Sequence, residues 1–341
     1  MDALVVSGPG VLTISQRPLA EPSPDQAVVR VLFGGICGSD LHYWRSGRVG
    51  ESVLLRPMVL GHEVVGVVER PAADGSGPAV GTRVAVHPAQ ICGACVFCAR
   101  GDQQLCENLR YLGSAARDPH TDGGFSEHLV IPAHRLVPVP DGLDLQVAAL
   151  AEPASVVLHG LRRLEHLGHS VEGRDVLITG AGPIGLLAVA LAHAGNARTI
   201  TATDLHDNPL KLALQIGATH TAQANEPLPP ADLVIESSGS PAAVALALRA
   251  LRPGGAMVNV GHLPADGVLA PLHLAVTREL TIAGSSRFYS ELPDALAIIA
   301  AHPHLFAPII SATYPLASAE AAFAEAADPS RSSKVLLTFA D

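Results

Sequence analysis

Residues 175–185 read DVLITGAGPIG, and the apolar stretch LLAVALAHAG follows at 186–195. The first five of these residues have the β-branched and apolar character of a buried strand, and the later stretch is apolar enough to form a buried helix. Further strands (199–203, 232–237 and 256–260) are predicted to alternate with further helices (209–216 and 240–251). Strands that alternate with helices in this way indicate a parallel sheet with right-handed crossovers. We therefore predict an α/β fold with a doubly wound parallel sheet in this part of the chain.

The glycines after the first strand have the spacing GxGxxG. Such a loop, directly after a strand and at the start of a helix, is the fingerprint of a dinucleotide-binding site. Gly180 allows the tight turn, Gly182 lets a pyrophosphate approach the backbone, and Gly185 lets the helix pack closely on the strand. The helix begins at Pro183 and Ile184, and its N-terminus offers free N–H groups to the phosphates. We expect these five residues to bind the cofactor.

An acidic residue is expected about 20 residues further on, at the end of the second strand, where it binds the adenosine ribose. Asp204 occupies that position, and its carboxylate would repel a 2′-phosphate. No arginine follows before Arg249, so the usual cationic receptor for that phosphate is missing. The sequence therefore favours NAD over NADP, although an ordinary helix N-cap would also explain the aspartate. Val260, at the end of a later strand, is expected at the same edge of the sheet.

The chain on either side of this α/β segment has a different character. The N-terminal part consists of short β-branched runs with glycine- and proline-containing turns between them. Its runs lie at 27–33, 64–69 and 82–86. After about residue 285 the character is mixed, and a strand-like stretch follows at 334–339. The sequence by itself leaves open which domain owns this C-terminal piece.

Four of the five cysteines crowd into residues 92–106. Cys92, Cys95, Cys98 and Cys106 supply four thiolates that can close a tetrahedral Zn²⁺ site with no open position, which is typical of a structural site. An iron–sulfur cluster is the alternative. A secreted disulfide framework would spread its cysteines along a shorter chain, so this crowding indicates a metal in a reducing compartment.

The remaining cysteine and a histidine suggest a second metal site. Cys37 lies in GGICGSDLHYW at 34–44, and His62 and Glu63 lie in PMVLGHEVVG at 57–66. A catalytic zinc has three protein ligands and one open or water-filled position. Cys37 and His62 would supply a thiolate and an imidazole, and the spacing leaves the third ligand open. Taken singly, a cysteine or a histidine is more often a core residue.

Composition limits the classes of partner. The 341 residues carry a net charge of −10, and 48% of them are hydrophobic, which describes a chain able to bury a large core. The negative charge disfavours nucleic acid and anionic membranes as partners, because both reward basic patches. The first residues lack the pattern of a secretory signal, and no apolar run reaches the length that spans a bilayer. We expect a cytoplasmic protein.

These motifs resemble the zinc-containing medium-chain dehydrogenase/reductase family over essentially the whole chain. The matching segments are 34–44, 57–66, the four-cysteine loop, AEP at 151–153 and GAGPIG at 180–185. Within the family the chain is most similar to the sorbitol and L-idonate dehydrogenases. The segments closest to the L-idonate enzymes are GSA at 113–115, PHTDGGF at 119–125 and SSRF at 285–288. The resemblance implies a GroES-like β-rich catalytic domain at 1–147, completed by 286–341, and a Rossmann domain at 148–285.

The resemblance also implies the ligands of the catalytic zinc. Cys37, His62 and Glu152 become the expected ligands. Glu63 is then a nearby carboxylate that ligates transiently or holds a metal-bound water. Asp40 is expected to accept the ring N–H of His62 and so to fix its tautomer.

For proton release the resemblance implies a relay through Ser39, a cofactor ribose hydroxyl and His42. The Cys-x-Ser-x-x-His spacing of the family is preserved here, although the same two residues could be ordinary turn and surface residues. The expected cofactors are a catalytic zinc acting as a Lewis acid, a structural zinc, and NAD as the hydride acceptor.

Further residues match positions that contact the substrate in polyol and L-idonate dehydrogenases. The expected contacts are Tyr43, Ser114, His120, Glu152, Arg287 and Phe288. Arg287 is also expected beside the cofactor, and its guanidinium could grip a sugar-acid carboxylate in a bidentate fork. Polyol enzymes carry this arginine too, so it does not decide between an acid and a polyol. Pro209 departs from the arginine that sorbitol dehydrogenases place near the adenosine, so part of their cofactor clamp is absent.

We therefore expect an NAD-linked enzyme that interconverts L-idonate and 5-keto-D-gluconate. The first alternative is a general polyol dehydrogenase acting on sorbitol or xylitol. A non-catalytic family member is a remote alternative, because every zinc ligand and every nucleotide glycine is present. Family members are commonly dimers or tetramers, and we expect a homotetramer.

Overall fold

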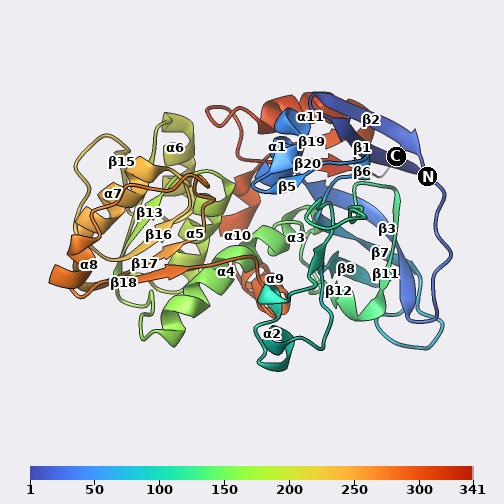
Figure 1. The fold of residues 1–341 in the computed structure, drawn as a ribbon, viewed down its shortest axis with the longest axis horizontal. Helices are drawn as coiled ribbons and strands as arrows, with labels where there is room; N and C mark the ends of the chain where they lie inside the picture. The colour runs from blue at the N-terminus through green and yellow to red at the C-terminus, as the bar shows by residue number, and fades with distance from the viewer. Residues whose placement is uncertain (340–341) are drawn as a thin grey trace.

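The structure, a computed structural model, describes residues 1–339. Residues 340 and 341, which end the expected catalytic domain, lie outside the described residues. Two large sheets organise the chain. In Figure 1 the sheet that contains the glycine-loop strand lies at the left, and the sheet that contains the N-terminal and C-terminal strands lies at the right.

The glycine-loop strand lies at the centre of a parallel sheet. The six strands of this sheet are β13 (Asp175–Thr179), β14 (Thr199–Asp204), β15 (His220–Gln223), β16 (Ala231–Glu236), β17 (Leu251–Asn259) and β18 (Thr281–Gly284). Their order is β15-β14-β13-β16-β17-β18, and every neighbouring pair is parallel. The order therefore runs outward from the centre in both directions and reverses between β13 and β16. This confirms the doubly wound sheet, and such a reversal is where open α/β sheets bind their ligands.

Two strands of this sheet, β15 and β18, lack the buried run by which a strand is recognised in a sequence. Both lie at the edges of the sheet and contain four residues. β15 reads HTAQ and is only half-buried or exposed. An edge strand of this kind follows from its pairing with a neighbour, which the sequence does not display.

Helices cover both faces of the parallel sheet. They are α4 (Ala151–His166), α5 (Pro183–Ala194), α6 (Asp207–Gln215) and α7 (Pro241–Ala250). Successive residues of a strand point to opposite faces. Val176 and Ile178 pack in one cluster with apolar residues of α4 and α5, whereas Leu177 packs in another cluster with those of α7. Because both faces are covered, the central strands read as nearly continuous apolar runs.

The β-rich part is built around a seven-stranded sheet. Its strands are β3 (Gln26–Gly35), β7 (Glu63–Arg70), β8 (Arg83–Val86), β11 (His128–Pro132), β12 (Leu136–Pro138), β19 (Ile310–Pro315) and β20 (Lys334–Thr338). β20 pairs with β3, and β19 pairs with β20. The C-terminal strands therefore complete a sheet that N-terminal residues begin, which answers the question of their ownership. The strands expected at 27–33, 64–69, 82–86 and 334–339 correspond to β3, β7, β8 and β20.

The remaining elements are short. β1 (Asp2–Gly8), β2 (Val11–Gln16) and β6 (Met58–Val59) form one small sheet, β9 (Ala89–Gln90) and β10 (Arg110–Tyr111) form a second, and β4 (Arg48–Val49) and β5 (Ser52–Val53) form a third. The other helices are α1 (Gly38–Ser46), α2 (Val96–Ala99), α3 (Leu145–Ala148), α8 (His273–Thr277), α9 (Leu292–Ala301), α10 (Pro303–Phe306) and α11 (Ala319–Ala326). Single 3₁₀ turns lie at η1 (Gln103–Leu105), η2 (Ala133–Arg135), η3 (Ala307–Ile309) and η4 (Leu316–Ser318). Within residues 1–339 no single helix is long and apolar enough to cross a membrane, although the pair Leu292–Ala301 and Pro303–Ile309, bent by 98°, matches a span by length and composition alone.

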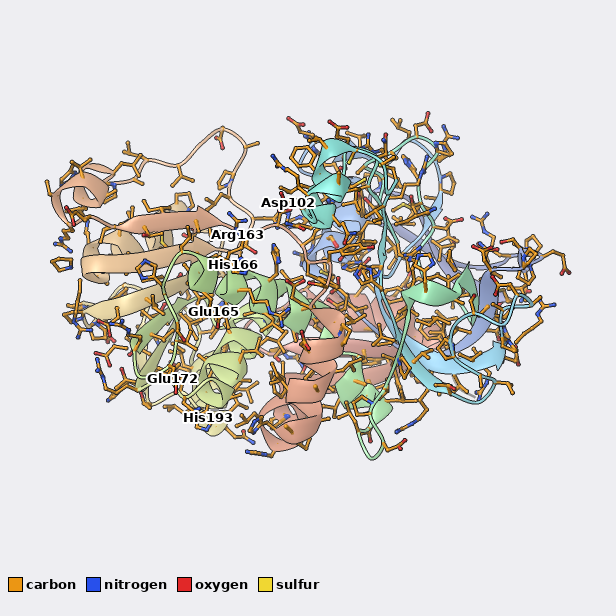
Figure 2. The ribbon with its side chains drawn as sticks, turned by 90° about the horizontal axis from the view of Figure 1, so that it is seen from below. Asp102, Arg163, Glu165, His166, Glu172 and His193 are labelled. Carbon is orange, nitrogen blue, oxygen red and sulfur yellow. The ribbon has the colours of Figure 1, made fainter. Side chains whose placement is uncertain are left out.

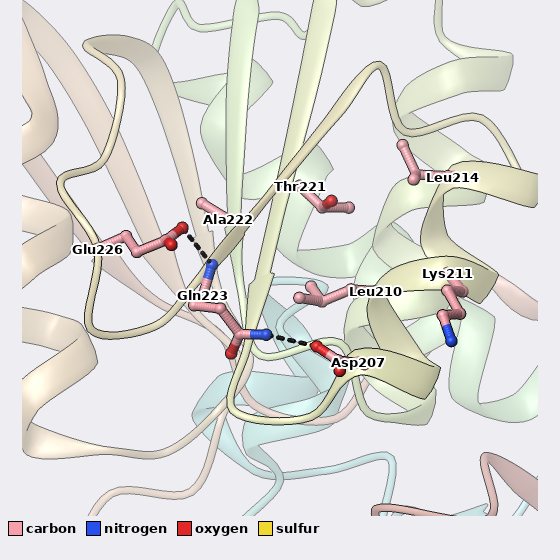
Figure 3. A pocket seen from close by; sticks show the side chains of 8 residues that line it. All are labelled: Asp207, Leu210, Lys211, Leu214, Thr221, Ala222, Gln223 and Glu226. Carbon is pink, nitrogen blue, oxygen red and sulfur yellow. Dashed lines mark hydrogen bonds between the residues drawn. The ribbon is translucent and has the colours of Figure 1, made fainter.

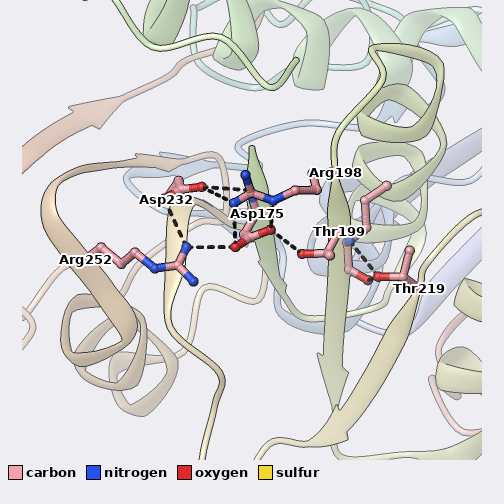
Figure 4. A network of polar contacts seen from close by, with 7 residues as sticks. Asp175, Arg198, Thr199, Thr219, Asp232 and Arg252 are labelled. Carbon is pink, nitrogen blue, oxygen red and sulfur yellow. Dashed lines mark hydrogen bonds and ion pairs between the residues drawn. The ribbon is translucent and has the colours of Figure 1, made fainter. Parts of the chain in front are cut away.

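Four charged side chains tie together the amino-terminal edge of the parallel sheet (Figure 4). Arg198 donates from Nε to Asp175 at 2.8 Å, and Arg252 donates from Nη1 to Asp175 at 2.9 Å and to Asp232 at 3.0 Å. The bond from Arg198, followed by those from Thr199 and Arg252, holds the pKa of Asp175 well below its usual range. This edge lies opposite the glycine loop, so the network links the strands without entering the site described next.

Candidate functional site

The pairing of β3 with β7 brings Cys37 and His62 together. β3 ends at Gly35 and β7 begins at Glu63, and these two residues are paired directly. Cys37 is the N-cap of α1, and His62 immediately precedes β7. One ligand atom each of Cys37, His62 and Glu63 lies within 4.8 Å of the other two. The expected thiolate and imidazole therefore meet, with a carboxylate beside them.

Buried acidic groups surround the imidazole of His62. Burial alone would lower the pKa of His62, yet Cys37, Asp40 and Glu152 raise it well above its usual value. Burial raises the pKa of the Asp40 carboxyl, which is 0% exposed. Buried anionic groups that converge on one point are costly unless a cation compensates them. A set of sulfur, nitrogen and carboxylate donors is the set that zinc prefers, so these residues fit a bound zinc ion.

Asp40 binds the backbone on both sides of this group. Its Oδ2 accepts the N–H of Cys37 at 2.9 Å, and its Oδ1 accepts the N–H of Gly61 at 3.2 Å. Among the described residues, these two backbone bonds take the place of the expected bond from the His62 ring. The charge of His62 nevertheless acts to lower the pKa of Asp40. Asp40 therefore holds the segments that carry Cys37 and His62, because its oxygens reach the backbone of each.

The carboxylate of Glu63 is bound by Lys334, the first residue of β20. The Lys334 Nζ donates to the two Glu63 oxygens at 2.8 and 2.7 Å and to the carbonyl of Ile36 at 3.2 Å. The side chains of Lys334 and Glu63 are 2% and 0% exposed. An ammonium group bound to both oxygens competes with a metal for the same lone pairs. Glu63 thus lies beside Cys37 and His62 while Lys334 binds both of its oxygens. No sequence motif singled out Lys334 as its partner.

Glu152 approaches the same group from the first turn of α4. Its side chain is buried, and burial raises its pKa to about 7. His62 and Glu63 both influence this pKa, which places them nearby. Among the described residues, however, Glu152 does not join the atoms that lie within 4.8 Å of one another. The expected third ligand is therefore close to Cys37 and His62 but not drawn in to the same distance.

Tyr111 links Glu152 to Arg287, although it belongs to none of the motifs of the sequence. Its hydroxyl donates to Glu152 Oε1 at 2.6 Å. Its ring centroid lies 5.8 Å from that of His62 and 5.1 Å from the guanidinium carbon of Arg287. Arg287 is exposed and has a left-handed backbone with φ 54°. Within residues 1–339 no carboxylate lies at ion-pair distance from its guanidinium.

The two expected relay residues lie one turn apart on α1. Ser39 is half-buried and His42 is exposed, so the helix leads from the interior to solvent. Tyr43, the next residue, is 2% exposed and packs in the core of the β-rich part. Its hydroxyl accepts the N–H of Ala115 at 2.9 Å. The ring of Tyr43 is therefore enclosed and its hydroxyl supports a turn, and its contact with the substrate stays a prediction.

His120 and Ser114 also bind the backbone. The His120 Nε2 accepts the N–H of Leu55 at 2.9 Å, and its Nδ1 lies 3.0 Å from the carbonyl oxygen of Arg117. Both ring nitrogens are thus engaged and His120 joins two loops, while its contact with a substrate stays a prediction. The Ser114 hydroxyl accepts the N–H of Ala116 at 3.3 Å, and its side chain is half-buried. This bond uses the Ser114 hydroxyl as an acceptor, so its O–H can still donate a hydrogen bond.

The expected contact of Phe288 with the substrate likewise stays a prediction. Its side chain is 0% exposed and belongs to the main hydrophobic core. Its ring packs against that of His87, with the centroids 5.1 Å apart. Its neighbour Arg287 is exposed, so the two residues that were expected to share the substrate lie in opposite environments. The backbone between them is not extended, because Arg287 has a left-handed conformation with φ 54°.

The glycine loop has the shape that a dinucleotide requires. Gly180 has φ 85°, and a Cβ at Gly185 would lie 1.8 Å from the carbonyl oxygen of Gly180. Gly182 is the N-cap of α5 and has open space where a Cβ would be. Pro183 and Ile184 form the first turn of this helix and are half-buried. The open space at a helix N-terminus fits a pyrophosphate.

Asp204 ends β14 beside this loop. Its Oδ2 accepts the N–H of Ala181 at 2.8 Å, and its Oδ1 accepts the N–H of His206 at 3.0 Å. Each oxygen retains a lone pair that could accept a ribose hydroxyl. Asp204 therefore joins the end of β14 to the loop that follows β13. Val260 follows β17 and is half-buried, and Pro209 is buried in α6.

Glu236 organises the same edge, although no motif indicated it. It ends β16, is 0% exposed, and accepts the N–H groups of Ser238 at 2.9 Å and Gly239 at 3.1 Å. Its carbonyl oxygen accepts the N–H of Val260 at 2.8 Å. It thereby fixes the loops at the point where the strand order reverses.

A groove of about 240 Å³ lies beyond Asp204, between α6 and β15 (Figure 3). Asp207, Leu210, Lys211, Leu214, Thr221, Ala222, Gln223 and Glu226 line it. Gln223 pairs with Asp204 in the sheet and donates from Nε2 to Asp207 at 2.7 Å. None of these eight residues belongs to the site expected from the sequence, so the groove is separate from the group formed by Cys37, His62 and Glu63.

The four cysteines of residues 92–106 form a second metal-capable group. Their sulfur atoms lie within 4.8 Å of one another, and three of the pairs are separated by 3.5, 3.5 and 4.0 Å. Four Zn–S bonds of about 2.3 Å at tetrahedral angles would place sulfurs about 3.8 Å apart, so the spacing fits a closed zinc site. The loop that holds them carries Asp102 and projects from the β-rich part (Figure 2).

Comparisons with known proteins point in the same direction. An alcohol dehydrogenase GroES-like domain matches residues 23–141, and a zinc-binding dehydrogenase domain matches residues 183–301. The chain is 34% identical to L-idonate 5-dehydrogenase (NAD(P)(+)) of Escherichia coli (strain K12), over 98% of each chain. It is 33% identical to sorbitol dehydrogenase of Homo sapiens, over 94% of this chain and 91% of that one. The crystal structure of the Escherichia coli L-idonate 5-dehydrogenase matches 99% of this chain and 97% of its own, with a TM-score of 0.90 and 32% identity.

Proposed function

This chain belongs to the zinc-binding alcohol dehydrogenase family, and from that premise we propose that it is an NAD-dependent enzyme that oxidises L-idonate to 5-keto-D-gluconate. The match to L-idonate 5-dehydrogenase of Escherichia coli over 98% of each chain supports the choice of a sugar acid. The residue best suited to bind the carboxylate of such a substrate is Arg287. Its guanidinium is exposed, lies over the ring of Tyr111, and reaches the neighbourhood of the buried Glu152 and His62.

We assign the catalytic zinc to Cys37, His62 and Glu152, with Glu63 as a nearby carboxylate restrained by Lys334. Bound zinc supplies a Lewis acid that lowers the pKa of an alcohol toward neutrality. The protein's part is to hold a thiolate, an imidazole and a carboxylate together in a dry site. The side chains of His62, Glu63 and Glu152 are 7%, 0% and 6% exposed, so little water competes there.

We assign the dinucleotide to the edge formed by Gly180, Gly182, Pro183, Ile184, Gly185, Asp204 and Val260. NAD, when bound, accepts the hydrogen and the electron pair that the substrate carbon loses. Asp204 supports NAD over NADP because its carboxylate would meet a 2′-phosphate. Arg287 stays a candidate contact to this cofactor as well as to the substrate.

The chain's own residues can carry the released proton. Ser39 and His42 lie one turn apart on α1, half-buried and exposed respectively. A hydroxyl can accept a proton and donate its own, and an exposed imidazole can pass a proton to water. We propose that these two residues conduct the substrate proton to solvent.

Basic side chains support an anionic substrate. Partial burial, and then the positive charges of His42 and Arg287, lower the pKa of His262, so these three groups share one neighbourhood. A sugar-acid carboxylate would gain from that environment, whereas a neutral polyol would not. A guanidinium can bind such a carboxylate in a bidentate fork. The proposed substrate contacts are Tyr43, Ser114, His120, Glu152, Arg287 and Phe288.

The test is a comparison of initial rates on L-idonate, sorbitol and xylitol, each with NAD and with NADP, read at the absorbance of the reduced nicotinamide. L-Idonate with NAD should give the highest kcat/KM. Arg287→Met should raise KM for L-idonate about 10- to 100-fold, because it removes a charged bond worth about 1.5–3 kcal/mol, and should change KM for sorbitol much less. A wild-type enzyme that prefers sorbitol or xylitol would transfer the assignment to a polyol dehydrogenase.

We also propose that the chain forms a homotetramer in which copies pair along β18. This strand lies at the edge of the parallel sheet. Apolar side chains on the strand and in the segment before it are exposed: Leu269 (95%), Leu272 (60%), Val276 (81%) and Ile282 (39%). An unpaired edge with exposed apolar side chains is typical of an interface. Light scattering after size-exclusion chromatography should show the mass fall for Val276→Asp, and a wild-type monomer would contradict the assignment.

Two broader expectations stand as proposals. The five cysteines form no disulfide within the described residues, which suits a reducing compartment, and we propose a cytoplasmic enzyme. We place the domain boundaries near residues 147 and 285, because α3 ends at Ala148 and β18 ends at Gly284.

A further inference from the structure

We propose that Tyr111 is a positioning residue that couples the four-cysteine loop to the active site by holding Glu152 and Arg287 in place. The inference rests on the function proposed for the chain. Tyr111 is not among the residues that the sequence or the family motifs select, and it reaches three of those that they do.

The hydroxyl of Tyr111 fixes one oxygen of Glu152. The two atoms lie 2.6 Å apart, and the side chains are 8% and 6% exposed. A phenol that donates to a buried carboxylate makes a short, strong bond that water does not replace. Because this bond uses Oε1, it leaves Oε2 as the oxygen that can turn toward Cys37 and His62. Tyr111 thus selects the orientation in which Glu152 can act as a ligand.

The ring of Tyr111 serves as a platform for two other groups. Its centroid lies 5.1 Å from the guanidinium carbon of Arg287, and the His62 ring meets it at an interplanar angle of 61°. Cation–π contacts of this kind hold a guanidinium over an aromatic face. Arg287 lies in a left-handed backbone conformation with an exposed side chain, so this face is a main restraint on where its charge points.

The position of Tyr111 itself depends on the cysteine loop. Tyr111 ends β10 and pairs with Ala89 of β9, and these two strands are the segments that enter and leave the loop at residues 92–106. Tyr111 also packs in the same small hydrophobic cluster as Cys98, Cys106 and Leu109. Closing the loop around a metal therefore fixes the ribbon whose last residue holds Glu152. Loosening the loop should reach the active site through this one side chain.

The first experiment compares Tyr111→Phe with the matched control Tyr314→Phe in the zinc-loaded enzyme. Tyr314 also donates its hydroxyl to a carboxylate, that of the half-buried Glu325, but this bond joins β19 to α11. Tyr111→Phe should lower kcat about 10- to 100-fold, the size expected for a hydrogen bond to a charged group, while KM for L-idonate changes little because the ring remains. Tyr111→Leu removes the ring too and should also raise KM. Equal kcat values for Tyr111→Phe and Tyr314→Phe would overturn the proposal.

A readout besides activity separates this inference from the substrate assignment. In the Co²⁺-substituted protein, Tyr111→Phe should shift the visible bands of the site formed by Cys37 and His62, and it should speed metal loss to a chelator. Tyr314→Phe should do neither, and NADH binding should match wild type in both. These shifts would support Tyr111 even if none of the tested alcohols were a substrate, and unchanged bands with unchanged metal retention would refute it.

The coupling to the loop is tested with a double-mutant cycle. Leu109→Ala loosens the cluster without touching a sulfur, and Cys95→Ser opens the cysteine site directly. Each should lower kcat in the wild-type background and have little further effect when Tyr111 is phenylalanine. If the losses in kcat multiply, the loop acts by another route and the proposal fails. Leu109→Ala keeps the test available if Cys95→Ser does not fold.

Discussion

Replacing Lys334 by methionine should strongly destabilise the fold. The substitution removes the ammonium group that binds both oxygens of Glu63 and keeps a long apolar side chain in its place. The two side chains are 2% and 0% exposed, so water cannot take over the role of the lost charge. Removing one partner of a buried ion pair costs about 3–5 kcal/mol, because the other charge stays buried and unpaired. That is a large part of the roughly 5–15 kcal/mol by which a domain is usually stable.

The assay is urea unfolding at neutral pH, followed by far-UV circular dichroism, with equal transition slopes required of every variant. Lys211→Met is the matched control, since Lys211 is the other lysine of the chain and is exposed; we expect a change within about 0.5 kcal/mol. The double variant Lys334→Met with Glu63→Gln should recover at least half of the loss, because no unpaired charge remains. A Lys334→Met protein within about 1 kcal/mol of wild type would refute the reasoning, as would a double variant no more stable than the single one.

Four further outcomes follow from the structure. Cys37→Ala should abolish turnover and leave NADH binding, measured by fluorescence, largely intact; normal activity would contradict its assignment as a ligand. Cys95→Ala should lower the melting temperature and remove about one zinc per chain in metal analysis, so normal melting with full zinc content would speak against a structural site. Gly185→Ala should weaken NADH binding at least tenfold, because the added Cβ would meet the carbonyl oxygen of Gly180 at 1.8 Å. Bonds from arginine hold the pKa of Asp175 below its ordinary value. The stabilisation from Asp175 is therefore present above its unfolded-state pKa of about 3.9 and is lost as the pH falls through its folded-state pKa. Asp175→Asn should cost about 1 kcal/mol of stability at neutral pH and progressively less below about pH 4, which melting temperatures measured across pH would show.

The parallel sheet could be predicted because its signals are local. DVLITGAGPIG carries a strand, a turn and a helix start in one stretch, and the central strands are buried on both faces and so read as apolar runs. The edge strands β15 and β18 escaped the same reading, because neither forms a continuous buried run. The four-cysteine site could also be predicted, because the spacing of the cysteines alone brings four sulfurs within reach of one metal.

The candidate active site could be predicted only in part. Family motifs pointed to Cys37, His62 and Glu152, but the same reasoning selected Phe288, which is fully enclosed. Position in a motif says which residues are near a site and not which way a side chain turns. That direction follows from the packing of neighbouring segments, which a motif does not contain.

Taken alone, the sequence determined the classes of chemistry available to this protein: a dinucleotide loop, a four-sulfur metal group, and a cysteine and a histidine suited to a second metal. The tertiary structure decided which further groups act on them. Lys334 meets Glu63 because β20 pairs with β3, and Tyr111 meets Glu152 because a ribbon beside the cysteine loop lies against the start of α4. The physical reason is that these are contacts between segments far apart in the chain, and their energies depend on burial and distance that only the folded chain creates.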